Sequence, residues 1–284
     1  MAAWWAQVRA EWVKTNSLRT TWVCLGLVVV ISVGLGALIS WVSATSWVGG
    51  SLSDRLQYDP VRTAEAGTLV AQFVVGVLGV LLVSTEYSSG LVAVSLSALR
   101  CRGTLMSAKL FVTGVLVLVV GEAVAFSSYF VSRAVLLGRG GKVVLHDSAS
   151  LQLHSHYIPV LALSDPGVLR ATAMAGVYLA LLSLLGVALG FMLRSGAGAI
   201  SLFVAVLLVS PIVVQLLPSG IGSHVNPFLP TNLGSGMMVD VLSHNAYGGN
   251  FLSWDSALGW LMLYVVVASG LGLWRLVRSD VSHQ

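Results

Sequence analysis

Residues Trp22 to Val42 read WVCLGLVVVISVGLGALISWV, an apolar run without a single charged side chain. A helix rises about 1.5 Å per residue, so a run of this length can cross the roughly 30 Å of hydrocarbon in a bilayer. Only 9% of the 284 residues are charged and 56% are hydrophobic. A soluble domain carries roughly 25% charged residues. The sequence therefore predicts an all-α integral membrane protein.

Working outward from this run, five further windows are long and nearly free of charge. Together they predict six transmembrane helices in one transmembrane domain that covers residues 1–284. We expect the spans at about 20–46, 67–85, 105–132, 168–193, 196–217 and 256–276. The proline- and glycine-containing loop 218–255 is partly apolar, which favours short interfacial or re-entrant helices there.

The first residues form a different kind of helix. Over about 2–16 the side chains of Trp4, Trp5, Val8 and Trp12 cluster on one face of a helical wheel. Three tryptophans on one face are typical of a helix that lies in the headgroup plane. We therefore expect an N-terminal interfacial elbow helix.

The positions of the basic residues predict the orientation. Nine Lys and Arg residues fall on the side of the termini and six on the other. Because cytoplasmic segments near helix ends carry the excess of Lys and Arg, both termini are expected in the cytoplasm. The stretch after the second span is then cytoplasmic too.

That stretch, residues 84–111, reads STEYSSGLVAVSLSALRCRGTLMSAKLF. As a helix over about 86–100 it has two apolar stripes on nearly opposite faces, so one can rest on the membrane bundle and the other can meet a protein docked from below. An ordinary loop helix would be shorter and more charged. The expected docking residues are Glu86, Tyr87, Gly90, Leu91, Val94, Ala98 and Arg100.

Glu122 is the one acid predicted inside a span. It lies about 20 Å of helix rise beyond Lys109, well within the membrane. A carboxylate at that depth is protonated, paired or next to a polar cavity. Two interpretations stay open: a place on the translocation path for substrate or protons, or a structural hydrogen bond or pairing, for instance with Arg133.

The sequence has no G-x-x-x-x-G-K-[ST] loop for nucleotide phosphates and no H-E-x-x-H zinc motif. His146, His154 and His156, with Asp147, are the densest titratable group. They have the chemistry for zinc or copper, but without a further ligand at a regular spacing a polar external loop is the better interpretation. We therefore predict no metal, no catalytic residues and no cofactor in this chain.

Several short stretches occur in a fixed order along the chain. They are TEYSSGL, LSALRCR and SAKL in 85–110, GEAVAF at 121–126, SDPGVLR at 164–170, LRSGAGAI at 193–200, and FLPTNLG and FLSWD in 228–255. This ordered set resembles the type-2 ABC transporter permeases, and the first three stretches resemble the cytoplasmic coupling segment of that family. Leu91 and Cys101 depart from the residues more common there, and both lie on the expected contact surface.

The resemblance implies the membrane subunit of a bacterial ABC exporter in the plasma membrane. Two such permease subunits, identical or homologous, would form the substrate pathway within the lipid, and each would rest on a separate nucleotide-binding ATPase subunit through the 86–100 coupling helix. ATP and magnesium would be bound by that partner, so the chain itself would be no enzyme. Glu122 would have a role shared with the family. No nucleic-acid partner is implied.

A proton-coupled secondary transporter or channel that uses Glu122 is the alternative. It predicts inverted repeats and several charges inside the membrane. The sequence shows one acid in a span and no visible repeat, which favours the exporter.

Overall fold

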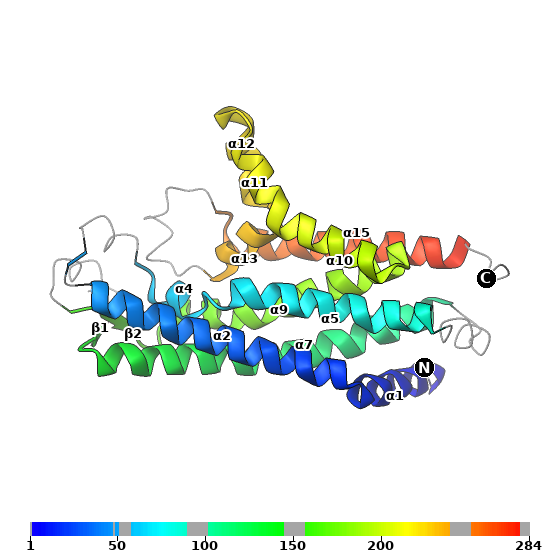
Figure 1. Cartoon of the computed structure of the whole chain (residues 1–284), viewed down its shortest axis with the longest axis horizontal. Coiled ribbons are helices and arrows are strands. Elements are labelled where there is room, and N and C mark those ends of the chain that lie inside the picture. The colour runs from blue at the N-terminus through cyan, green and yellow to red at the C-terminus, as the bar shows by residue number, and fades with distance from the viewer. Residues whose placement is uncertain are drawn as a thin grey trace.

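The computed structural model describes residues 2–47, 49–50, 58–89, 102–144, 157–238 and 251–278. Its long helices run side by side along one axis (Figure 1). The N-terminal helix and the last turn of the C-terminal helix lie at one end of the bundle, here called the terminal end. The two short strands and a short helix lie at the opposite end, here called the far end.

Within these described residues, six helices are long and apolar enough to cross a membrane, so the chain is a multi-pass α-helical membrane protein and the prediction of six spans is confirmed. They are α2 (Arg19–Ser46), α5 (Thr68–Ser88), α7 (Arg102–Gly138), α9 (Pro166–Leu193), the segment Gly196–Gln215 that begins with α10, and α15 (Trp254–Arg278). The observed bounds lie within a few residues of those expected, except that α7 continues six residues past the predicted end at 132.

Helix α9 is the centre of the bundle, packed against α5, α7, α10 and α15. Small residues permit the close approach: a Cβ atom on Gly79 would collide with the carbonyl oxygen of Ser183, and one on Gly186 would collide with that of Gly76. Lipid supplies no hydrophobic force between helices, so contacts of this kind, which bring backbones together, stabilise membrane bundles.

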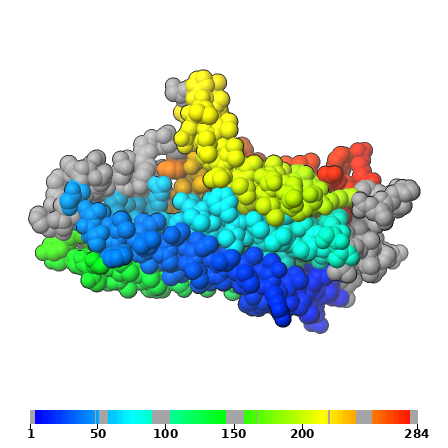
Figure 2. All heavy atoms as spheres, viewed as in Figure 1, coloured from blue at the N-terminus to red at the C-terminus, as the bar shows by residue number. Residues whose placement is uncertain are grey.

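The fifth span is bent. It consists of α10 (Gly196–Val204), the π-helical turn η2 (Ala205–Val209) and α11 (Ser210–Gln215). Pro211 has no N–H for the carbonyl of Leu207 and its ring crowds that carbonyl, which accounts for the break. The Thr231 hydroxyl donates to the Leu207 oxygen instead, at 3.1 Å. As a result α11 and the following helix α12 (Ser219–Val225) stand away from the bundle (Figures 1 and 2).

Shorter elements complete the described chain. The predicted short helices of the 218–255 loop are present as α12, η3 (Asn226–Phe228) and α13 (Pro230–Met238). At the far end lie α4 (Pro60–Ala64) and a parallel pair of strands, β1 (Lys142–Val144) and β2 (Pro159–Leu161), with Val143 opposite Val160. The strands were not expected from the sequence, because each has only three residues.

Exposed tryptophans mark the level of the membrane. Trp22 and Trp41 lie near the two ends of α2, and Trp254 and Trp274 near the two ends of α15, each at least 39% exposed. Within each helix the two rings are separated by about 30 Å of helix rise, the thickness of a hydrocarbon core. Because indole rings favour the membrane–water boundary, the two boundaries lie close to these rings.

Candidate functional site

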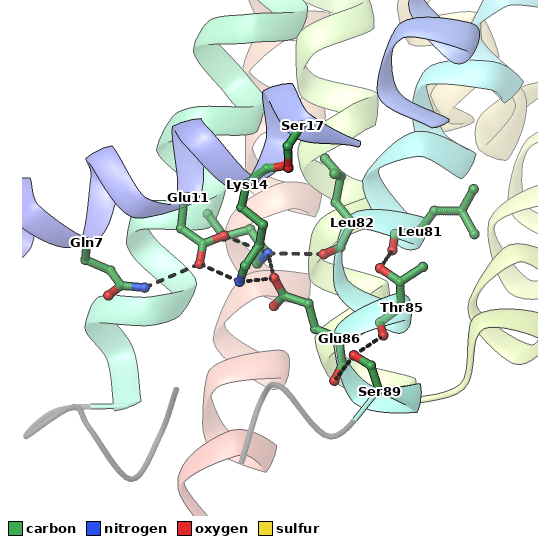
Figure 3. A network of polar contacts seen from close by, with 10 residues as sticks. Gln7, Glu11, Lys14, Ser17, Leu81, Leu82, Thr85, Glu86 and Ser89 are labelled. Carbon is green, nitrogen blue, oxygen red and sulfur yellow. Dashed lines mark hydrogen bonds and ion pairs between the residues drawn. The ribbon is translucent and has the colours of Figure 1, made fainter. Parts of the chain in front are cut away.

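A buried network of charged side chains lies at the terminal end of the bundle (Figure 3). Glu11 and Lys14 come from α1 (Ala2–Ser17), Glu86 from the last turn of α5, and Lys109 from the start of α7. Glu11, Glu86 and Lys109 are each less than 5% exposed. Lys109 Nζ lies 2.8 Å from both Glu11 Oε2 and Glu86 Oε1, and Lys14 Nζ contacts Glu86 and lies 3.3 Å from Glu11 Oε1.

The network is balanced in charge, with two acidic and two basic side chains. The Lys109 ammonium donates hydrogen bonds to Glu86 Oε1 at 2.8 Å and to the carbonyl of Leu82 at 3.1 Å, and forms an ion pair with Glu11 Oε2. Burial lowers the pKa of Lys14, but the hydrogen bond and charge of Glu86 and the charge of Glu11 outweigh burial, so the net pKa lies above its ordinary value. Lys14 is therefore an ammonium group, and it pairs with the carboxylate side chains of Glu11 and Glu86.

Apolar contacts hold α1 in the position that the network needs. Val8 packs with Ala108 and Val112 of α7. The Trp4 indole donates to the Ser107 hydroxyl at 3.1 Å and meets the ring of Phe111 edge-on at 5.4 Å. The predicted tryptophan face is thus divided: Trp4 and Trp5 both meet the Phe111 ring of α7, but Trp5 and Trp12 are still 53% and 42% exposed. Glu11 follows Trp4 by seven residues, about two turns on the same side of α1, and it is buried where it meets Lys109 of α7.

The expected docking helix is only partly within the described chain. The prediction that a new helix begins at Glu86 differs from the structure, in which Glu86 and Tyr87 form the last turn of α5. Two lysines hold the Glu86 carboxylate there, and the Tyr87 ring packs edge-on against that of Phe191 at 6.4 Å. Five residues of the predicted docking surface lie outside the described residues: Gly90, Leu91, Val94, Ala98 and Arg100. The histidines His146, His154 and His156 and their neighbour Asp147 also lie outside them.

A tight turn completes this end. Arg194 follows α9 with φ 55°, and Ser195 then caps α10 by accepting from the amide of Gly198 at 3.3 Å. The Arg194 guanidinium donates to the carbonyl of Arg275 at 3.0 Å and lies over the Tyr87 ring at 5.8 Å. The ends of α5, α9 and α15 are therefore connected beside the charged network.

Glu122 lies in α7 against α9, where Gly176 leaves room for it: a Cβ atom at position 176 would be 2.7 Å from the carboxyl carbon of Glu122. Pairing with Arg133 is excluded by position, because eleven residues of helix put the two side chains about 16 Å apart along the axis. Arg133 instead lines a small cavity with Tyr129 and Leu161.

A second acid, which lies outside the predicted spans, is a neighbour of Glu122. Glu65 follows α4 and is 1% exposed. Its Oε2 accepts from the Thr68 hydroxyl at 3.0 Å, whereas Oε1 has no hydrogen-bond partner among the described residues. Burial raises the pKa of Glu65 to about 8, and the charge of Glu122 adds to this rise while the Thr68 hydrogen bond opposes it. Glu65 therefore holds a proton at neutral pH.

The two sites have different chemistry. The terminal-end network can transmit movement, since it connects α1, α5 and α7 by contacts that resist separation, whereas the Glu65–Glu122 region can hold a proton or meet a cation. No protein-family model matches the chain, and no curated protein does either. The fold and the sites define the class of protein: a membrane protein with six candidate spans in the described chain and a buried charged network at one end.

Proposed function

We propose that this chain is the membrane-spanning subunit of an ATP-driven ABC exporter in a bacterial plasma membrane, with both termini in the cytoplasm. In this proposal two permease subunits enclose the substrate pathway. Each is driven by a separate ATPase subunit that binds ATP and magnesium and contacts residues 86–100.

The observation that supports this proposal is the position of the charged network. Glu86 lies two residues before α5 ends at Ser88, and Lys109 lies seven residues after α7 begins at Arg102. The network thus joins the two helices that flank residues 90–101, and it joins both to α1. A force applied to the segment that connects α5 and α7 would move these three helices as one unit. Coupling to an external ATPase requires such a joint movement.

The proposal is tested by replacing Leu91 in the predicted docking stripe with a charge. Leu91→Asp is expected to remove the ATPase subunit from the purified complex while the permease still inserts and is recovered in normal amount. Val143→Asp is the matched control, because Val143 is 49% exposed in β1 at the far end. Recovery of a stoichiometric ATPase with the Leu91→Asp variant would refute docking at this segment.

One observation favours a second candidate, a proton-coupled transporter. The buried acid Glu65 is a neighbour of the partly buried Glu122, and together they offer a site that can load and release a proton. The purified chain in liposomes distinguishes the two functions. Proton flux driven by a pH gradient without any ATPase, and lost in Glu122→Gln, would support the second candidate and contradict the first.

A further inference from the structure

A shallow groove of about 470 Å³ lies between α2 and α7 toward the far end. Its small side chains, Ala37, Ala134 and Gly138, leave the space open, and a Cβ atom on Gly138 would meet nothing within 4 Å. Leu38 adds an apolar wall and is 48% exposed. Figure 2 shows α2 and α7 side by side along the edge of the molecule that carries this groove.

The positively charged side chain of Arg139 lies at the end of the groove. The Arg139 guanidinium lies over the Trp41 ring at 5.0 Å, and both residues line the groove. No carboxylate in the described part of the chain forms an ion pair with Arg139. Stacking on the indole uses the flat face of the guanidinium, so its N–H donors at the edge stay available for an anion.

The groove lies at the headgroup level of one bilayer leaflet and leads onto an apolar surface at the level of the hydrocarbon chains. Trp41 lies at the membrane boundary, and one to three turns deeper in the membrane the surface of the same helices continues apolar and open. Val30 is 69% exposed, Val131 is 38% exposed, and a Cβ atom on Gly34 would meet nothing within 4 Å. A ligand that fits must therefore carry an anionic group at headgroup level and a hydrocarbon chain below it.

We propose that this groove binds an anionic phospholipid of the leaflet at the far end. The phosphate accepts hydrogen bonds from the Arg139 guanidinium, whose planar fork matches two phosphate oxygens. The glycerol backbone fills the space above Ala37 and Ala134, and an acyl chain continues over Gly34. The complementary charge and the membrane level favour a lipid, because lipid is the anion present in bulk at that depth.

The test measures thermal unfolding of the purified chain in neutral detergent while phosphatidylglycerol, or phosphatidylcholine with the same acyl chains, is added. Phosphatidylglycerol is expected to stabilise the wild type at lower concentration than phosphatidylcholine. Arg139→Gln is expected to weaken the phosphatidylglycerol response about tenfold, because hydrogen bonds to a charged group are lost. It should weaken the phosphatidylcholine response less, because the choline ammonium already offsets the charge of the phosphate in that lipid. Gly138→Leu fills the groove and is expected to weaken both responses.

Lys142→Gln is the matched control, since Lys142 is a cation that lies over the Tyr157 ring at 3.6 Å at the same end of the molecule but outside the groove. Its response to phosphatidylglycerol should equal that of the wild type. Should Arg139→Gln fail to fold, Arg139→Lys keeps the charge without the fork and should show an intermediate response. The proposal is overturned if the Arg139 variants respond like the wild type, if Lys142→Gln weakens the response equally, or if glycerol phosphate alone stabilises the chain as well as the lipid does.

Discussion

Lys109 is the residue on which the terminal-end network depends, because it touches both acids and is 3% exposed. Replacing it with Met would leave Glu11 and Glu86 buried with only the half-buried Lys14. Losing one partner of a buried ion pair costs roughly 3–5 kcal/mol. Lys109→Met should therefore lower the unfolding temperature strongly in detergent.

A second substitution separates charge from packing in this prediction. Adding Glu86→Gln to Lys109→Met removes one of the uncompensated charges, so the double variant should be more stable than Lys109→Met alone. Lys14→Met is the milder comparison, since its ammonium is partly exposed. Equal unfolding temperatures for Lys109→Met and the wild type would show that the network contributes nothing to folding.

Glu65 predicts a pH dependence of stability. Its pKa is about 8 in the folded chain against an ordinary value of 4.5, so the folded state holds the proton more tightly than the unfolded state. The stabilisation is complete below pH 4.5 and is lost as the pH rises toward 8 and past it. Unfolding temperatures measured from about pH 5 to pH 9 should fall more for the wild type than for Glu65→Gln. Parallel curves for the two proteins would contradict the buried, protonated state.

At the scale of single elements, the bend in the fifth span depends on the replacement of a backbone hydrogen bond to the Leu207 carbonyl by one from the Thr231 side chain. Pro211 cannot donate to the Leu207 carbonyl, and Thr231 donates in its place. Thr231→Val should leave that carbonyl without a partner and cost roughly 1 kcal/mol. In a Pro211→Ala background the new backbone N–H at this position can take over the bond, so the same Thr231→Val change should cost less. A double-mutant cycle on unfolding temperatures measures the difference, and additive effects would contradict the exchange.

The elements differ in how far the sequence predicts them. The spans are predictable because an uncharged window of about 20 residues has few alternatives in a membrane protein. The bend is signalled by Pro211, although the partner Thr231 is not, because it comes from a separate short helix. The network and Glu65 are not predictable from one sequence, because nothing in it says which acid meets which base across three helices, or that the turn after α4 buries its carboxylate.

At the scale of the whole molecule, the orientation in the membrane is the property that the proposed function depends on. The helix α1, the Arg194 turn and the last turn of α15 share the terminal end (Figure 1). The proposed ATPase contact requires this end to face the cytoplasm. The excess of Lys and Arg on the same side supports that orientation, because such residues resist transfer across the membrane.

Cysteine labelling in intact cells tests the orientation. In a background where Cys101 is replaced by Ser, the remaining Cys24 is only 8% exposed and should react little. Ser17→Cys lies on an exposed turn of α1 at the terminal end, and Ser164→Cys lies exposed before α9 at the far end. A thiol reagent that does not cross membranes should label Ser164→Cys in intact cells and Ser17→Cys only after the membrane is opened. The reverse pattern would place the charged network outside the cell, beyond the reach of any cytoplasmic ATPase, and would remove the basis for the exporter proposal while leaving the six-helix fold intact.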